Sequence, residues 1–369
     1  MAFSYPQTID SAPPSGVIEI DLGALADNYR LMRAQAHGAE VAAAVKADAY
    51  GLGAARVGKA LWDAGCRRFF VATVEEGAAL RRTLPRAEIA VLNGLMAGDE
   101  GPVMAARLMP VLNDPEQVRR WDAACGRAGE RGEAMIHVDT GMNRLGMTVA
   151  EAAALAASVP DNVRIAVVMS HLACARLAAH PLNARQLQRF LRVRSLFPTA
   201  QASLANSAGV LLGEAYCFDL ARVGIALYGG NPIEGRLNPM KPVVRLSARI
   251  LQERYAEPGE TVGYDATFTA SRPTRLAIIA AGYADGWPTP ASGRGRAAFG
   301  DLIVPFAGRV SMDLIALDVT DVPPMATVPG NMVELIGPRW TLDDAAGAAG
   351  LISYELLTGL GRRFERRYV

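Results

Sequence analysis

The sequence predicts an α/β fold, with a TIM-like (β/α)8 barrel followed by a mostly β C-terminal domain. Between residues 41 and 228, eight short apolar runs alternate with amphipathic segments of helical spacing. Runs that are apolar throughout are typical of parallel strands covered on both faces, and eight such units match the closed barrel. Beyond residue 240 this rhythm stops, and short apolar runs are separated by glycine and proline. We therefore expect a disordered segment at 1–16, a barrel at 17–240 and the β domain at 241–369.

Composition narrows the class of protein. The chain has 369 residues, of which 51% are hydrophobic and 20% charged, and its net charge is +1. A balanced charge argues against a nucleic-acid partner or a polybasic membrane surface. No apolar run reaches the roughly 18 residues of a membrane span, and the N-terminus lacks the basic start and apolar core of a secretion signal. The four cysteines form no CxxC pair, which fits a reducing compartment, so we expect a cytoplasmic protein.

The predicted elements of the barrel follow one another in a regular order. Residues 17–22 alternate like a half-exposed strand, and a helix with an apolar face follows. The eight strand-like runs are 41–47, 69–74, 89–94, 108–112, 135–138, 165–171, 202–206 and 223–228. Helices are expected at 74–84, 114–128 and 183–197, where Thr73, Asp114 and Asn183 are suitable capping residues.

The β domain is predicted from shorter signals. Residues 243–255 alternate weakly, and Glu-Pro-Gly-Glu at 257–260 indicates a turn. Strands are expected at 276–280, 302–306, 315–319 and 332–336, and a last helix at 342–348 after Thr341. Neither internal repeats beyond the βα rhythm nor low-complexity tracts are apparent.

Lys46 is the first candidate for chemistry. It follows an apolar strand, where poor solvation favours the neutral amine that condenses with aldehydes. Pyridoxal phosphate is the common aldehyde partner of such a Schiff-base lysine. The alternative is a lysine at a strand end that reaches for water.

Other polar residues are also expected at the carboxyl ends of barrel strands, where this fold places its chemistry. They are Asp139, Asn143 and Arg144 after the fifth run, His171 at the end of the sixth, Asn206 and Ser207 at the end of the seventh, and Arg222, which opens the eighth and is followed by Gly224. This shared position favours the functional interpretation of Lys46.

Arg222 and Ser207 each have two interpretations. Arg222 either pairs with a carboxylate such as Asp219 or faces the pyridine nitrogen of the cofactor, which it would leave unprotonated. Ser207 either caps a helix or, with Asn206 and the amides of Gly224 and Ile225, holds a phosphate at the usual phosphate site of this fold.

Two stretches of the second domain are candidates as well. Tyr264 is either a packed strand tyrosine or a general acid/base, for which nearby cations would have to make its phenol more acidic. Residues 308–313 are either a plain turn or a loop that offers a backbone amide to a substrate carboxylate. No histidine and carboxylate pattern has the spacing of a metal site.

Nine motifs along nearly the whole chain resemble those of the alanine racemase family of pyridoxal phosphate enzymes. They are AVKADAYGLG (44–53), DTGMNRLG (139–146), SHLA (170–173), ANSA (205–208), RVGIALYG (222–229), VGYDATF (262–268), GYADGWP (282–288), GRVSMD (308–313) and ISYE (352–355). The resemblance implies a cofactor-binding barrel, a β domain, and a head-to-tail homodimer whose active sites take residues from both chains.

The resemblance also implies roles for single residues. Lys46 is similar to the Schiff-base lysine and D-face base, and Tyr264 of the partner subunit to the L-face base. Arg222 matches the arginine at the pyridine nitrogen, His171 the residue that orients it, and Arg144 the arginine near the phenolic oxygen and substrate. The implied phosphate ligands are Tyr50, Ser207, Gly224, Ile225 and Tyr354, and the implied substrate and entrance residues are Met312 and Tyr283.

Several positions depart from the family pattern. His137 stands where many members have a carbamylated lysine, so Arg144 needs another support, for which a bound anion is one candidate. Leu52 replaces a common histidine, and Ser311 a frequent cysteine. Arg176 and Thr289 stand where an Asp and an Arg are often paired at the entrance, which leaves strict preference for alanine open.

The expected function is interconversion of L-alanine and D-alanine by two bases, either to supply D-alanine for peptidoglycan or to break it down. A racemase of broader range, acting on serine or lysine, is the first alternative. A non-catalytic pyridoxal phosphate protein would resemble the barrel alone, and a barrel decarboxylase would place an acid, not Arg222, at the ring nitrogen.

Overall fold

The computed structural model describes residues 14–369, which form two compact units. One unit is Asp21–Val243, and the other combines Gly16–Ile20 with Val244–Val369. The disorder expected for residues 1–16 falls almost wholly outside the described part of the chain, and Gly16 already belongs to a strand. Within residues 14–369, no helix is both long and apolar enough to cross a membrane.

The first unit is an eight-stranded parallel barrel, with strand order β8-β7-β6-β5-β4-β3-β2-β9. The ring closes where the Asp219 amide donates to the Ala202 carbonyl (3.0 Å) and the Arg222 amide to the Ala205 carbonyl (2.9 Å). Its strands are β2 (Glu40–Ala44), β3 (Arg68–Val71), β4 (Glu88–Val91), β5 (Met109–Leu112), β6 (Gly132–His137), β7 (Val163–Met169), β8 (Gln201–Ser203) and β9 (Leu220–Val223).

The predicted barrel is confirmed, with one strand misplaced. The eighth strand was expected at 223–228, but β9 ends at Val223 and Ile225–Tyr228 form the 3-10 turn η2. All of 220–228 is buried, so the apolar run does not by itself distinguish the strand from the turn that follows it. As a result Arg222 lies inside the strand instead of opening it.

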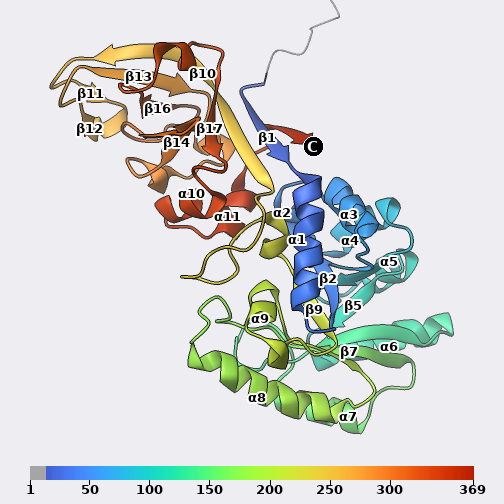
Figure 1. The fold of residues 1–369 in the computed structure, drawn as a ribbon. Helices are drawn as coiled ribbons and strands as arrows, with labels where there is room; N and C mark the ends of the chain where they lie inside the picture. The colour runs from blue at the N-terminus through green and yellow to red at the C-terminus, as the bar shows by residue number, and fades with distance from the viewer. Residues whose placement is uncertain (1–13) are drawn as a thin grey trace, which may run out of the picture. The chain divides into compact units, whose positions relative to one another are not determined.

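Helices cover the outside of the barrel (Figure 1). They are α1 (Leu22–Gln35), α3 (Ala54–Asp63), α4 (Val74–Thr83), α5 (Glu100–Ala105), α6 (Pro115–Ala128), α7 (Val149–Ala157), α8 (Pro181–Leu196) and α9 (Ser207–Leu211). Thr73 and Asp114 cap α4 and α6 as predicted, accepting from the Glu76 and Gln117 amides. The prediction for α8 was wrong at its start, because Pro181 opens the helix and His180 caps it.

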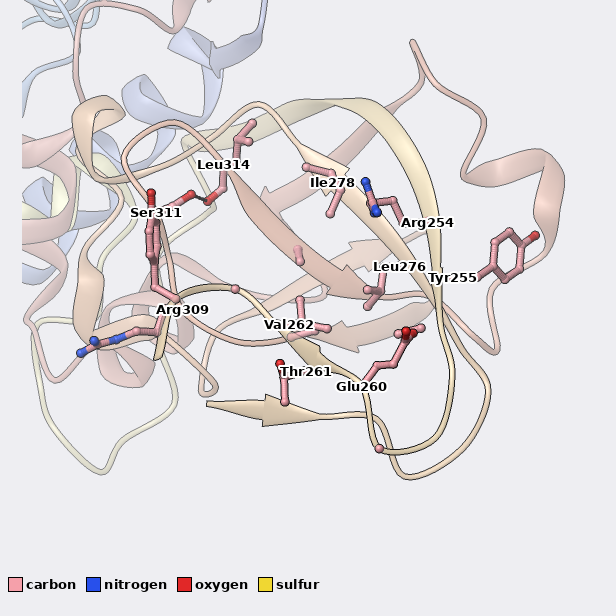
Figure 2. A pocket seen from close by; sticks show the side chains of 16 residues that line it. Arg254, Tyr255, Glu260, Thr261, Val262, Leu276, Ile278, Arg309, Ser311 and Leu314 are labelled. Carbon is pink, nitrogen blue, oxygen red and sulfur yellow. Dashed lines mark hydrogen bonds between the residues drawn. The ribbon is translucent and has the colours of Figure 1, made fainter. Parts of the chain in front are cut away.

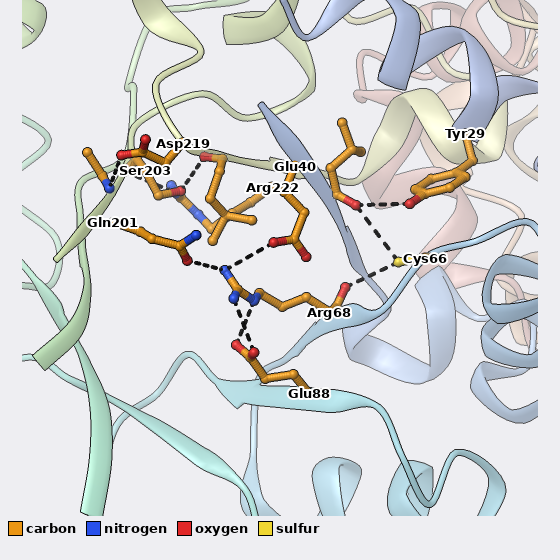
Figure 3. A network of polar contacts seen from close by, with 12 residues as sticks. Tyr29, Glu40, Cys66, Arg68, Glu88, Gln201, Ser203, Asp219 and Arg222 are labelled. Carbon is orange, nitrogen blue, oxygen red and sulfur yellow. Dashed lines mark hydrogen bonds and ion pairs between the residues drawn. The ribbon is translucent and has the colours of Figure 1, made fainter. Parts of the chain in front are cut away.

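The barrel interior is apolar at its middle and polar at both ends. Apolar side chains such as Phe70, Met135 and Val167 fill the centre. At the amino-terminal ends of the strands, Arg68 lies between Glu88 (2.6 Å), Glu40 (3.6 Å) and Gln201 (3.0 Å), as Figure 3 shows. This ion-pair network closes one end of the barrel, so polar groups at the opposite end are the ones available for chemistry.

The second unit is built on a mostly antiparallel sheet with the order β15-β14-β17-β10-β1-β18, to which β13 and β16 are added through β10. Its strands are β1 (Gly16–Ile20), β10 (Val244–Ala256), β13 (Thr274–Ile279), β14 (Arg296–Phe299), β15 (Leu302–Pro305), β16 (Ile315–Asp318), β17 (Met332–Ile336) and β18 (Glu365–Tyr368). A separate hairpin pairs β11 (Thr261–Val262) with β12 (Phe268–Thr269). Two helices, α10 (Leu342–Ala348) and α11 (Ser353–Gly359), complete the unit.

The four predicted strands and the helix at 342–348 are present, but the assignment of 17–22 to the barrel was wrong. Strand β1 pairs with β10 and β18 in the sheet of the second unit. Its alternating pattern fits a sheet with one covered face better than a barrel strand buried on both faces. Strand β10 was indicated only by the weak alternation at 243–255, and strands β14 and β18 were not predicted, since arginines such as Arg249 and Arg366 interrupt the apolar pattern.

Candidate active site

Lys46 lies at the carboxyl end of β2, where the chain enters a left-handed turn labelled α2 (Lys46–Tyr50). Four successive residues from Ala47 to Tyr50 have φ between 51° and 58°, and Gly51 continues with φ 82°. Side chains with a Cβ rarely adopt this conformation, and such strain is typical of functional sites. The turn must therefore be held by its surroundings.

Two carboxylates hold this turn. Glu76, from the first turn of α4, accepts from the Ala47 amide (2.7 Å) and from the Ala72 amide after β3 (2.8 Å). Asp48 accepts from the Ala54 amide at the start of α3 (2.7 Å). The position of Lys46 thus depends on charged hydrogen bonds to two neighbouring helices.

The Lys46 amine is prepared for chemistry at neutral pH. It is half-buried, and its Nζ makes no hydrogen bond or ion pair among residues 14–369. Burial lowers the pKa of Lys46, the positive charge of Arg144 lowers it further, and Glu76 opposes both. A lowered pKa favours the neutral, nucleophilic amine, as the sequence predicted.

Arg222 is buried inside the barrel, with 6% of its surface exposed. Its Nη1 donates to the carbonyl (3.0 Å) and hydroxyl (2.5 Å) of Ser203, and its Nη2 to the Ser170 carbonyl (2.5 Å). Figure 3 shows the contact with Ser203. No carboxylate pairs with Arg222 within the described chain; Asp219 instead accepts from the Ala202 amide (2.8 Å).

This arginine is therefore a buried cation without an anion. Burial lowers its pKa to about 9, so it remains charged at neutral pH. It lies 3.4 Å from Nδ1 of His171, whose pKa is held well below the usual value by burial and then by Arg222. His171 is consequently neutral and accepts from the guanidinium, and its role in orienting Arg222 stays a prediction.

Tyr50, Gly224 and Ser207 lie close to one another near the carboxyl ends of β2 and β9. The ring of Tyr50 stacks on Tyr228 with centroids 4.5 Å apart, and a Cβ on Gly224 would lie 2.3 Å from Tyr50 Oη. Ser207 Oγ accepts from the Gly224 amide (2.9 Å) and the Ala226 amide (3.4 Å). No residue among 14–369 accepts the Ser207 hydroxyl hydrogen, although the side chain is buried, so this donor is available to a ligand.

Asn206 and Ile225 belong to the same region. Asn206 Oδ1 accepts from the Gly209 amide (2.9 Å), so Asn206 is the cap of α9 and Ser207 is not. Ile225 begins η2 and is fully buried. Their roles toward a phosphate stay predictions.

Arg144 lies on a loop that Asp139 organises. The Asp139 carboxylate accepts from the amides of Gly141 (2.8 Å), Met142 (2.8 Å) and Asn143 (2.9 Å). Arg144 itself is exposed and makes no hydrogen bond within residues 14–369. Its guanidinium is therefore free to bind an anionic or electron-rich group.

The second unit holds the other predicted residues, on three loops that contact one another. The Ala284 amide donates to the Met312 carbonyl (2.9 Å), and the Tyr283 amide to the Ser311 carbonyl (3.0 Å). A Cβ on Gly282 would lie 2.3 Å from the Met312 oxygen, which explains the glycine. Tyr264 lies on the 3-10 turn η3, whose Asp265 forms an ion pair with Arg309.

Arg363 links two of these loops, which the sequence analysis missed. Its Nε donates to Asp285 (2.6 Å) and its Nη1 to Asp313 (2.8 Å). Tyr354 lies on α11, whose last residue Gly359 abuts Gly286. The second unit thus brings Tyr264, Met312, Tyr283 and the end of α11 into one set of connected loops.

Tyr264 also lines a cavity of about 880 Å³ in this unit (Figure 2). Polar groups from Arg254, Glu260, Arg309 and Ser311 surround it, together with apolar side chains such as Leu276. Tyr264 and Met312 are 70% and 53% exposed on this chain, so both side chains are available to another molecule.

Sequence reasoning missed four further residues that support the site. They are Glu76, Asn113, Ser203 and Arg363. Each acts through a contact with a residue distant in sequence, which no local pattern reveals. The one available signal was position, because Asn113 and Ser203 lie at the carboxyl ends of β5 and β8.

Comparison with known proteins gives matches along nearly the whole chain. Residues 20–232 match the family described as alanine racemase, N-terminal domain, and residues 243–368 match alanine racemase, C-terminal domain. The alanine racemase of Methylobacterium nodulans is 50% identical over 353 residues, or 95% of each chain. A catabolic and a biosynthetic alanine racemase of Agrobacterium fabrum are 49% and 48% identical, over 96% and 95% of this chain and 92% and 93% of theirs.

Solved structures agree with these matches. A crystal structure of alanine racemase from Bartonella henselae with covalently bound pyridoxal phosphate is 40% identical, with a TM-score of 0.92 over 97% of this chain and 100% of that one. The biosynthetic alanine racemase of Pseudomonas aeruginosa is 37% identical, with a TM-score of 0.90 over the same shares.

Proposed function

The chain belongs to the alanine racemase family, and we propose that Lys46 and Tyr264 are the two bases with which it interconverts L-alanine and D-alanine. The reaction and its cofactor, pyridoxal phosphate, are those of the family. The observation that carries the assignment of Lys46 is its unpaired Nζ at the mouth of the barrel, with a pKa lowered by burial. Relatives named as catabolic and as biosynthetic match almost equally, so both supply and breakdown of D-alanine are part of the proposal.

The residues present fit the cofactor. Ser207 has a buried hydroxyl donor for which no acceptor lies among residues 14–369, and Gly224 lets the Tyr50 hydroxyl approach its backbone, since a Cβ there would lie 2.3 Å from Tyr50 Oη. Arg222 and Arg144 supply positive charge, and neither is paired with a carboxylate among residues 14–369, so an anionic ligand would balance them. In this arrangement Lys46 would hold the aldehyde carbon, Tyr50, Ser207, Gly224, Ile225 and Tyr354 the phosphate, and Arg222 the ring nitrogen.

Pyridoxal phosphate, once bound, supplies an aldehyde that condenses with amines and a ring that accepts electrons from the α-carbon. The chain's residues then move the proton. Tyr264 Oη removes the α-proton of L-alanine, and Lys46 Nζ returns a proton to the opposite face. Two bases are needed because a single base tends to return the proton to the face from which it came.

We further propose a homodimer in which Tyr264, Met312 and Tyr283 serve the site of the partner subunit. The exposure of Tyr264 and Met312 on this chain supports that role, since a general base must be shielded from water to work efficiently. A cytoplasmic location is also part of the proposal, in keeping with the four cysteines, all of which are free.

Mixing two inactive variants tests the bases and the shared site together. We would refold Lys46→Ala and Tyr264→Ala as a mixture with pyridoxal phosphate. If each site uses Lys46 of one subunit and Tyr264 of the other, a mixed dimer has one intact site, and about a quarter of wild-type activity returns for random pairing. If both residues served the same chain, no intact site would form and activity would stay absent.

Direction-specific exchange tests the roles of the two bases. In Tyr264→Ala we expect selective loss of α-deuterium exchange from L-alanine, because the L-face base is removed. Equal loss from L- and D-alanine would contradict the two-base scheme. Lys46→Ala should lose racemisation and the visible absorbance of the covalently held cofactor, and retention of both would refute its assignment.

A broader racemase is the second candidate, because the entrance residues are altered. Arg176 pairs with Glu234 of its own chain (2.7 Å) instead of awaiting an acid elsewhere. Deuterium exchange across L- and D-alanine, serine and lysine decides the range. Exchange confined to alanine would exclude this candidate.

A further inference from the structure

Two buried polar side chains, Asn113 and His137, face each other at the carboxyl ends of the adjacent strands β5 and β6. They are 5% and 7% exposed, and Nδ1 of His137 lies 2.9 Å from Oδ1 of Asn113. The mechanism above uses neither residue. A buried polar pair in the mouth of the barrel calls for an explanation.

The surroundings of Asn113 determine which atom of its amide faces the histidine. Its Nδ2 donates to two carbonyls, those of Val111 (2.9 Å) and Leu92 (3.2 Å). Carbonyls only accept, so the NH₂ group must point at them and Oδ1 must face His137. The backbone of Asn113 is held as well, since its N–H donates to Gln117 Oε1 (2.9 Å).

This orientation determines the tautomer of His137. Asn113 Oδ1 only accepts, so the hydrogen lies on Nδ1 of His137, and Nε2 keeps its lone pair. Within residues 14–369, Nε2 has no hydrogen-bond partner. The ring thus presents a single acceptor atom.

The charged neighbours of His137 are mainly positive. Burial, then Arg222 and then Arg144 lower its pKa to about 4, while Asp139 opposes them. A protonated ring would place a second N–H among these guanidinium groups. The acceptor form is therefore the form that the site stabilises.

Arg144 is the neighbour able to use this acceptor. Both terminal nitrogens of Arg222 are already bonded to Ser203, Ser170 and His171. Arg144 makes no hydrogen bond within the described chain. It also lies seven residues after His137, on the loop that Asp139 holds in place.

We infer that Asn113 and His137 form a positioning pair, in which Asn113 fixes the tautomer of His137 and Nε2 of His137 accepts a hydrogen bond from Arg144 when the cofactor is bound. The pair supports Arg144 without a bound anion. This inference rests on the proposed function, because Arg144 is there assigned to the cofactor and substrate.

Nuclear magnetic resonance of the holoenzyme labelled with ¹⁵N-histidine tests the tautomer directly. We expect a protonated Nδ1 and an unprotonated Nε2 for His137 throughout pH 6–8. His180 is the internal control, because its Nδ1 accepts from the Leu182 amide (3.2 Å), so the hydrogen of its neutral ring lies on Nε2. Protonation of His137 at Nε2 in this range would overturn the inference, whether or not any variant folds.

A double-mutant cycle tests the action through Arg144. His137→Leu removes the acceptor and should raise the dissociation constant of pyridoxal phosphate about 5- to 10-fold, with a shift of the visible absorbance. His137→Gln keeps an acceptor and should recover most of this loss. In an Arg144→Ala background the same His137→Leu change should have almost no effect.

Additive effects in the cycle would overturn the inference, because His137 would then act by packing alone. The failure of the proposed function looks different. It would remove the Lys46-dependent absorbance in the wild-type chain, whereas a failed inference leaves that absorbance intact. Dependence of wild-type cofactor affinity on added chloride would also count against the pair, since it would point to an anion beside Arg144.

Discussion

Replacing Glu76 with glutamine is the most direct test of how the chain holds Lys46. The carboxylate accepts from the Ala47 and Ala72 amides, at 2.7 and 2.8 Å. Glutamine has one acceptor oxygen, so only one of these amides keeps its partner and the other meets an NH₂ group. Either the left-handed turn after β2 or the segment after β3 would then lose its hydrogen bond to α4.

The structure gives the expected magnitude. Left-handed φ costs about 1–2 kcal/mol per residue, or about 4–8 kcal/mol for the four residues from Ala47 to Tyr50. A hydrogen bond to a charged group contributes about 1.5–3 kcal/mol, and partial exposure of Glu76 places its bonds at the lower end. We therefore expect Glu76→Gln to lower the free energy of unfolding by about 2 kcal/mol.

The assay has a matched control in Glu75→Gln. Glu75 has the same charge and lies in the same first turn of α4, but it is exposed and does not contact the turn after β2. Its loss should cost much less than that of Glu76, as for an exposed first-turn acid. Urea unfolding gives both free energies, and cofactor titration should show weaker binding in Glu76→Gln alone. Equal losses of stability in the two variants would refute the role assigned to Glu76.

Three further outcomes are expected. Arg222→Lys should lower kcat by at least 10-fold, because one ammonium cannot make the forked contacts to Ser203 and Ser170. Circular dichroism should show that the barrel stays folded, and an unchanged kcat would mean that these contacts do not matter for the reaction. Burial lowers the pKa of His137 from about 6.5 in the unfolded chain to about 4 in the folded protein, so the unfolded chain binds a proton more readily between these values. The free energy of unfolding should therefore be unaffected above pH 6.5 and fall by up to about 1.4 kcal/mol per pH unit from pH 6.5 towards pH 4. Urea midpoints measured across this range should show a smaller slope for His137→Gln. Iodoacetamide should modify half-buried Cys174 before Cys66, because burial raises the pKa of the Cys66 thiol to about 12. Mass spectrometry of the native protein gives the order of modification, and earlier modification of Cys66 would contradict this expectation.

The barrel was predictable because its signal is local and repeated. Each buried parallel strand is an apolar run, so strands such as β3 and β6 appear in the sequence without knowledge of their neighbours. The position of Lys46 and His171 at strand ends followed from the fold class alone. The end of the eighth strand did not, because Gly224 and the buried turn after it carry no polar signal.

The strands of the second unit were harder to predict from the sequence for a physical reason. Strand β10 contacts β1, β17 and β13 along its length, so its covered face changes with its partner. Strand β18 contains Arg366 and Arg367 and is paired with β1 from the other end of the chain. Pairing between distant segments determines these strands, and a window of neighbouring residues contains no record of it.

The supporting contacts explain why the barrel mouth carries excess positive charge. Arg144 and Arg222 lie near both histidines and Lys46 lies near His171, and burial keeps both rings neutral. The nearby carboxylates are engaged elsewhere, with Glu76 and Asp139 bonded to backbone amides. An acid free to pair with Arg222 would compete with an anionic ligand and would raise the pKa of Lys46. The same arrangement thus favours an anionic cofactor and keeps Lys46 in its reactive form. Glu76 and Asp139 therefore contribute to the chemistry of the site by binding backbone amides and leaving the cations unpaired within residues 14–369.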